Sequence, residues 1–155
     1  MSYIVSGLQS APFAPLFGLD DQALAQRGIR RMTAPQDGLY PCRVTLADVP
    51  AGTDVLLLSY QHQPAHTPYR AEGPIFVTEG HAETAVATGE VPLMMAKRIL
   101  SVRAYDGDDM IVDADVIDGK DADALFRRYL ARPEVAYLHV HLARRGCYAG
   151  RVDRM

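Results

Sequence analysis

The sequence predicts an α+β fold built mainly on antiparallel sheet, with about seven strands and about three short helices. Several segments alternate apolar and polar side chains with the period of two that is typical of half-buried strands. Only three segments have the spacing or the caps of helices, and no strand–helix–strand alternation with glycine-rich turns indicates a doubly wound parallel sheet. The length of 155 residues, 48% of them hydrophobic, fits a single domain over residues 1–155 with its own core.

The predicted strands are segments rich in β-branched and aromatic residues that lie between Gly and Pro turns. The strongest covers residues 55–62, and its first half is apolar on both faces, which indicates a central position. Pro41 marks residues 39–46 as an edge strand or a strand start. The other predicted strands cover residues 2–6, 74–78, 99–105, 111–117, 135–142 and 147–152.

Three short helices are expected, and each has a signal at one of its ends. Asp20 is a suitable N-cap for the first, and Gly28 follows it at the C′ position. Pro92 can occupy the first turn of the second helix. The third is amphipathic and is ended by Pro133. Their predicted ranges are residues 21–27, 92–98 and 122–130.

Two connecting segments are expected to be long loops. Residues 63–73 contain Pro64 and Pro68, which favour an ordered loop. Such a loop is either functional or a cover over an edge of the core. Residues 79–89 are polar and irregular, and we predict a mobile surface loop there.

One face of the predicted sheet carries polar, mostly titratable side chains. Tyr137, His139 and His141 alternate along one strand and lie opposite apolar residues. Arg103 and Tyr105 do the same on another strand. A half-solvated sheet face without a function is the alternative, but such a face favours Lys, Glu and Thr over these residue types.

A strand register follows for the hairpin whose turn is Asp106-Gly107-Asp108. A slip of one residue would bury Asp113 and Asp115, so we expect both to share the polar face of Arg103. This register places Arg103 directly opposite Asp113. An ion pair between these two side chains is then the alternative to a ligand contact for Arg103.

Charge and hydropathy exclude two classes of partner. A net charge of -3 and a pI near 5.9 disfavour binding to nucleic acid. The basic cluster Arg144-Arg145 is too short to follow a phosphate backbone, so we expect it in a solvated loop tip. No apolar run is long enough to span a bilayer, and the N-terminus lacks the pattern of a signal peptide. We therefore expect no membrane partner, a cytoplasmic location, and free thiols at Cys42 and Cys147.

His139 and His141 form the sharpest local signal. Side chains at i and i+2 on a strand point to one side, as two ligands of a metal ion must. A third ligand is needed. The candidates are Cys147, His62, Asp113 and His81, but none stands at a diagnostic spacing. No metal ligand is assigned and no cofactor is named, and a metalloprotein is kept as one alternative.

Cys147 is also a candidate nucleophile. A thiolate–imidazole pair with His139 or His141 would use Asp113 or Asp115 to orient the ring. No nucleophile-elbow sequence accompanies this cysteine, and cysteine is often a small buried hydrophobe.

Arg70 and Arg103 are candidates for binding an anion, because a guanidinium offers a planar fork to carboxylate or phosphate. For Arg70 the alternative is a contact that anchors its loop to backbone carbonyls. The loop that begins after His62 is expected to fold over the polar face. The predicted ligand-binding residues are His62, Arg70, Arg103, Tyr105, His139, His141 and Cys147.

A set of short motifs runs over nearly the whole chain. They are Tyr40-Pro41-Cys42-Arg43, Tyr60-x-His62-Gln63-Pro64, Thr67-Pro68-Tyr69-Arg70, Gly73-Pro74-Ile75-Phe76-Val77, Arg103-Ala104-Tyr105-Asp106, Asp113-Ala114-Asp115-Val116, His139-Val140-His141 and Gly146-Cys147-Tyr148. Together they resemble the domain-of-unknown-function family 1203 (DUF1203). The resemblance implies a bacterial, stand-alone, single-domain protein, and it implies no activity.

Two further classes of function stand beside the metalloprotein. The first, which we favour, is a small-molecule enzyme or binding protein whose His, Arg and Tyr pocket takes a small anionic molecule. The second is a non-catalytic interaction protein that uses the same polar face to bind another chain, or its own copy in a homo-oligomer. A pocket that encloses Arg103 and His139 favours the first class, and a flat exposed face favours the second.

Overall fold

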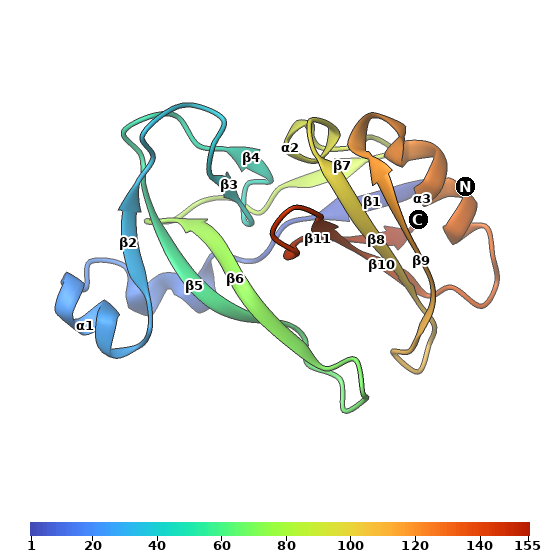
Figure 1. Ribbon diagram of the computed structural model, residues 1–155, viewed down its shortest axis with the longest axis horizontal. Coiled ribbons are helices and arrows are strands. Elements are labelled where there is room, and N and C mark those ends of the chain that lie inside the picture. Colours follow the sequence, from blue (N-terminus) through green and yellow to red (C-terminus); the bar gives the residue numbers. More distant parts are fainter.

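The computed structural model describes residues 1–155 and contains two β-sheets with a few short helices (Figure 1). The six-stranded sheet has the order β7 (Val86–Thr88), β1 (Tyr3–Ser6), β11 (Cys147–Arg154), β10 (Tyr137–Leu142), β8 (Ile99–Tyr105) and β9 (Ile111–Asp118). The five-stranded sheet has the order β2 (Arg30–Thr33), β5 (Asp54–Gln63), β6 (Ala71–Thr78), β3 (Pro41–Cys42) and β4 (Ala47–Asp48). All pairings are antiparallel except that of β3 with β6. The predicted α+β class is confirmed.

The three predicted helices are present, and two short 3-10 helices accompany them. The predicted N-cap of the first helix is confirmed, because Asp20 Oδ1 accepts a hydrogen bond of 2.7 Å from the Ala23 amide. Gly28 follows that helix with φ of +70°, a conformation that glycine adopts without strain. No helix is both long and apolar enough to cross a bilayer. The helices are α1 (Asp21–Gln26), α2 (Leu93–Ala96), α3 (Ala122–Leu130), η1 (Ala11–Leu16) and η2 (Gly119–Asp121).

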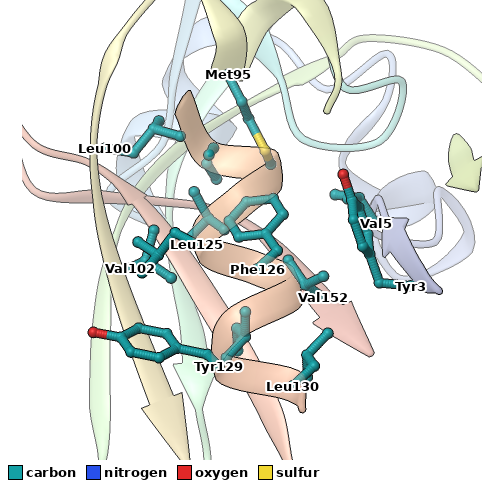
Figure 2. Packing of buried hydrophobic residues seen from close by; sticks show 14 of the residues in the cluster. Tyr3, Val5, Met95, Leu100, Val102, Leu125, Phe126, Tyr129, Leu130 and Val152 are labelled. Carbon is teal, nitrogen blue, oxygen red and sulfur yellow. The ribbon is translucent and has the colours of Figure 1, made fainter. Parts of the chain in front are cut away.

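Helix α3 covers one face of the six-stranded sheet and forms the larger core. Its spacing places Leu125, Phe126 and Tyr129 on the same side, and all three are buried. Figure 2 shows these side chains packed against Val102 of β8 and Val152 of β11. Burial of each large apolar side chain contributes about 1.5–3 kcal/mol to stability.

A second core lies against the five-stranded sheet, around η1 and α1. Leu24 of α1 is fully buried among residues of β5 and β6 such as Leu56 and Ile75. The apolar first half of β5 is therefore buried, as its sequence predicted, and β5 lies inside the sheet between β2 and β6.

The number of strands exceeds the prediction because three strands lack a sequence signal. β2 has the sequence Arg-Arg-Met-Thr, and β4 and β7 have only two and three residues. The strand expected over residues 39–46 reduces to β3, because the chain turns at residues 43–46, where Leu46 adopts φ of 51°. β7 lies within residues 79–89, so part of the predicted mobile loop is held in the sheet by β1.

The predicted register of the β8–β9 hairpin is wrong by one residue. Arg103 pairs with Ala114, and Asp113 pairs with Ala104, because an irregularity lies between Ala104 and Tyr105. Between the pairs Ala104–Asp113 and Tyr105–Ile111, β9 has one residue more than β8, and this places Asp113 on the α3 side of the sheet. It stays partly exposed there, because β9 is the edge strand and Arg132 and Tyr129 hydrogen-bond its carboxylate.

The two sheets meet where the distal half of β5 crosses the face of the six-stranded sheet opposite α3. Ring contacts join His62 and Tyr60 of β5 to Tyr148 of β11. Figure 1 shows the tip of the β5–β6 hairpin beside the tip of the β8–β9 hairpin. The Thr67 hydroxyl donates a hydrogen bond to the Asp109 carbonyl across these tips, at 3.4 Å.

Candidate functional site

The polar face predicted for β8 and β10 exists, but it is covered rather than solvated. His139 lies directly opposite Arg103 in the ladder, and Tyr137 lies opposite Tyr105. The residues His139 and His141 are only 3% and 1% exposed, because β5 packs over them. This burial contradicts a half-solvated face at β10, whereas Val112 and Val116 of the edge strand β9 remain exposed.

His62 of β5 completes a group of three imidazoles with His139 and His141, which we call the histidine cluster. The ring centroids of His62 and His141 are 4.8 Å apart, and His139 lies 6.2 Å from His62 and 6.5 Å from His141. Tyr148 contacts all three rings, and Tyr105 contacts His139 at 4.9 Å. The fold thus brings together four of the predicted site residues from three strands.

The imidazoles of the histidine cluster are neutral and poorly satisfied. Nδ1 of His141 lies 2.9 Å from the Gly146 carbonyl oxygen, which can only accept, so Nδ1 carries the proton and Nε2 has a bare lone pair. Four buried nitrogens have no hydrogen-bond partner: both of His62, Nδ1 of His139 and Nε2 of His141. Such groups are rare in folded proteins.

Burial sets the protonation of the cluster. Desolvation, reinforced by the neighbouring histidines and by Arg151 and Arg103, lowers the pKa of His139 to about 3. Desolvation also lowers the pKa of His141 to about 3, although its bond to Gly146 opposes the shift. Desolvation and Arg103 lower the pKa of His62. All three rings are therefore hydrogen-bond acceptors at neutral pH.

A buried polar chain links the two sheets beside the cluster. Gln63 Nε2 of β5 donates to the Tyr137 hydroxyl at 2.8 Å, and that hydroxyl donates to Asp109 Oδ1 at 2.5 Å. Arg151 lies over the Tyr137 ring at 3.9 Å. These contacts hold β5 against β10 and fix the spacing between His62 and His139.

The two arginines predicted to bind an anion make different contacts in the structure. Arg103 takes part in no ion pair, since its expected partner Asp113 binds Arg132 on the other face. Arg70 is exposed and donates from Nη1 to the Pro64 carbonyl at 2.9 Å, the loop-anchoring contact that was its alternative. It does not reach the histidine cluster.

The third-ligand and nucleophile hypotheses need correction. Asp113 and Asp115 lie on the face away from the histidines, so they neither orient an imidazole nor complete a metal site with it. The Cys147 thiol contacts the Arg145 carbonyl at 3.9 Å and bonds to no histidine. Both cysteines are free thiols, as predicted. As the side chains stand, no group of three His, Cys, Asp or Glu residues is arranged to hold a metal ion.

A pocket of about 720 Å³ lies between the sheets, near the β10–β11 turn; we call it the basic pocket. Its walls are apolar side chains, including Leu57 and Phe76 of the five-stranded sheet and Leu142 of the six-stranded sheet. Cys147 lines it, whereas His139 and Arg103 do not. Five cationic residues and no acidic residue also line it: Arg43, Lys97, Arg98, Arg144 and Arg145.

Arg43 is the unusual member of the basic pocket. Its side chain is buried, with 2% exposure of the residue, yet no carboxylate pairs with it. Nε donates to the Tyr148 carbonyl at 2.7 Å and Nη1 to the Pro41 carbonyl at 2.6 Å. Nη2 makes no hydrogen bond within the chain and is not sealed from the pocket. Desolvation lowers the pKa of Arg43 to about 10, so the group stays charged.

Lys97 and Arg98 belong to the same pocket but are already partnered. Asp48 accepts from both, at 2.7 Å each. Arg144 and Arg145 are exposed at the turn and have no acidic partner. The loop-tip prediction for these two is correct, but it missed their place at the mouth of a pocket. Only the tertiary structure brings them to Arg43.

The fold and the site define a two-sheet α+β protein with an enclosed histidine cluster and a separate basic pocket. The family model described as a protein of unknown function (DUF1203) matches residues 39–154, and the chain therefore belongs to the DUF1203 family. This match confirms the resemblance carried by the motifs. Comparison with curated proteins and with solved structures gave no match.

Proposed function

We propose that this protein binds a small anionic molecule with an apolar part, and that the ligand lies in the basic pocket. The observation that carries the proposal is Arg43, a buried guanidinium without a carboxylate partner on the wall of a 720 Å³ pocket. A buried charge is costly unless it is paired. An anion at Nη2 would supply the missing partner.

The charges around the pocket favour the same ligand class. Five of the 16 Lys and Arg residues line this one pocket, although the chain has a net charge of -3. The guanidinium of Arg43 offers a charge-assisted hydrogen bond to a carboxylate or a phosphate. Leu57, Phe76 and the other apolar walls suit an aliphatic or aromatic portion, and the volume is in the range of about 300–1,000 Å³ common for small-molecule sites.

The proposal keeps the anionic ligand expected from the sequence and places it away from Arg103 and His139. Of the predicted ligand-binding residues, Cys147 is the one on the pocket wall. No general base bonds to its thiol, so the geometry supports binding rather than catalysis at this site. A cytoplasmic location and a bacterial source are part of the proposal, and two free thiols fit a reducing compartment.

A fluorescence titration with 1-anilinonaphthalene-8-sulfonate, an anionic aromatic probe, tests the proposal. We expect saturable binding at one site, displacement by octanoate or octyl phosphate, and no displacement by octanol at the same concentration. The double substitution Arg144→Ala/Arg145→Ala should weaken binding by about 5–30-fold, because it removes about 1–2 kcal/mol of interaction with the anion.

The matched control is Arg30→Ala/Arg70→Ala, which removes two exposed guanidiniums outside the pocket. It should bind the probe like the parent protein. Equal weakening in the two double variants, or displacement by octanol as strong as by octanoate, would overturn the proposal.

A further inference from the structure

Cys147 lines the basic pocket, and anion binding alone leaves its thiol without a role. The residue is partly exposed at the first position of β11. Its sulfur makes one weak contact, at 3.9 Å from the Arg145 carbonyl oxygen, and no other hydrogen bond. The thiol is therefore free to react with a molecule that enters the pocket.

The charged side chains on the pocket wall are all positive. Five cationic residues share this wall with Cys147, and no acidic residue does. Arg144 and Arg145, in the turn that leads into β11, are exposed and have no acidic partner. Reactive cysteines are typically found in such electropositive, partly exposed surroundings, whereas structural cysteines are buried. The pocket therefore favours reaction of its thiol with an anionic reagent.

Arg43 independently indicates that an anionic group binds beside this thiol. The residue is only 2% exposed, no carboxylate pairs with it, and its Nη2 faces the pocket without a hydrogen bond. Its Nε donates at 2.7 Å to the carbonyl of Tyr148, the residue after Cys147. Desolvation lowers the pKa of Arg43 and the negative charge of a Cys147 thiolate opposes that shift, so the two groups lie within electrostatic reach.

We infer that Cys147 is a site of reversible modification by a small acidic thiol compound, of the class that glutathione represents, which it holds as a mixed disulfide. The inference rests on the proposed function, because the cations that bind the anionic ligand also attract the carboxylates of the reagent. Arg43, Arg144 and Arg145 offer charge-assisted hydrogen bonds to those carboxylates. The pocket volume of about 720 Å³ is in the range of small-molecule sites.

The modification is a thiol–disulfide exchange. The Cys147 thiol loses its proton to solvent, and the thiolate attacks one sulfur of a symmetrical acidic disulfide. A bond forms between Sγ and that sulfur, the disulfide bond of the reagent breaks, and the other half leaves as a thiolate that takes up a proton. The Cys147 sulfur is oxidised and the leaving half is reduced, so the disulfide itself is the oxidant. An excess of the reduced thiol reverses the exchange.

The second cysteine does not take part. Cys42 is fully buried in the core of the five-stranded sheet, and its sulfur accepts a hydrogen bond of 3.3 Å from the Thr78 amide. A reagent as large as glutathione reaches it only when the chain unfolds.

Reaction rates with disulfides of opposite charge test the inference. The probes are oxidised glutathione, which is anionic, and cystamine, which is cationic, with the reduced full-length protein at neutral pH. Each rate constant is divided by that of the same reagent with 2-mercaptoethanol, a neutral thiol. The normalised rate constant should be at least about tenfold higher for oxidised glutathione, because electrostatic attraction raises association rates by about 10–10³-fold. Mass spectrometry should find one glutathione per native chain and none on Cys147→Ser.

Matched double variants show whether the pocket charges cause the preference. Arg144→Ala/Arg145→Ala should lower the ratio of the two normalised rate constants at least about threefold, because it removes two of the attracting charges. Arg30→Ala/Arg70→Ala, which removes two exposed guanidiniums outside the pocket, should keep the parental ratio. Equal normalised rates for the two disulfides, an equal decrease in both variants, or an adduct on Cys42 would overturn the inference.

The octanoate titration separates this inference from the proposed function. Binding of octanoate together with equal normalised rates for the two disulfides would overturn the inference alone. A preference for oxidised glutathione that is lost in Arg144→Ala/Arg145→Ala, in a protein that does not bind octanoate, would support the inference and overturn the proposed function.

Discussion

The ring of Tyr148 on β11 stacks on the ring of His62 on β5, with centroids 5.4 Å apart and planes inclined by 6°. This contact joins the two sheets directly. The backbone of Tyr148 also accepts a hydrogen bond from Arg43, at the edge of the basic pocket. One residue thus touches both the histidine cluster and the guanidinium that we propose as the anion anchor.

Tyr148→Ala should lower the free energy of unfolding by about 3–5 kcal/mol, because it empties a buried aromatic site between the sheets. The control is Tyr148→Phe, which keeps the ring. The hydroxyl makes no hydrogen bond within the chain, so the Phe variant should unfold at nearly the parental urea concentration. A large decrease in the free energy of unfolding of Tyr148→Phe would show that the hydroxyl, and not ring stacking, stabilises the contact between the two sheets.

Mild acid should destabilise the protein before its carboxylates titrate. The pKa of His139 and of His141 is about 3 in the folded protein and near 6.5 in the unfolded chain. Below pH 6.5 the unfolded chain therefore binds two protons that the native state does not, and stability falls with pH until about pH 3. Between about pH 7.5 and pH 5.5 the expected loss is about 2–3 kcal/mol.

Urea unfolding at the two pH values measures this loss. His66→Gln/His81→Gln changes only exposed rings and should keep the same pH dependence. Free energies of unfolding that agree within error at the two pH values would contradict the prediction that the buried neutral histidines determine how stability depends on pH in this range.

Gly119→Ala should destabilise the protein by at least about 3 kcal/mol, the upper end of the usual cost of overpacking. A Cβ there would overlap the carbonyl oxygen of Met95 and lie 2.6 Å from that of Arg98. Neither backbone group can move without disturbing α2. Gly107→Ala is the control, because nothing lies within 4 Å of its Cβ position, and its thermal midpoint should match that of the parent.

The two thiols should differ in reactivity. Cys42 is fully buried and its sulfur accepts from the Thr78 amide at 3.3 Å, whereas Cys147 is partly exposed on the wall of the basic pocket. Titration with a thiol reagent should detect one rapid equivalent in the native protein and two after denaturation. An anionic ligand should slow the rapid phase, and two equally fast equivalents in the native state would contradict the structure.

The sequence predicts the elements whose side chains follow one period over six residues or more. β10 and α3 belong to this group, and the apolar side chains of both lie in the core as the pattern predicts, although β5 also covers the polar face of β10. The short strands β2, β4 and β7 do not, because they form only where a neighbouring strand supplies their hydrogen bonds. The register of β9 was missed because an irregularity one residue wide reverses every side chain beyond it.

The candidate site could also be predicted from the sequence only in part. Strand alternation is enough to place His139, Arg103 and Tyr105 on one face, and the structure confirms that grouping. The packing of β5 against the six-stranded sheet has no signal in the local sequence, so the burial of that face could not be predicted. Arg43 has no distinguishing signal in the sequence. We propose it as the anion ligand because no carboxylate lies beside it in the folded chain, and the sequence alone does not show this.

The displaced register of β9 also determines which side chains line an open edge of the six-stranded sheet. β9 is an unpaired edge of the six-stranded sheet, and Val112 and Val116 on it are 37% and 63% exposed. An edge of this kind invites strands from other molecules. Asp113 and Asp115 alternate with the valines along the same edge, so two copies that met there would bring carboxylates together, while the local irregularity bends the strand away from straight pairing. The charged residues and the irregularity of β9 are features that disfavour edge-to-edge pairing of two copies.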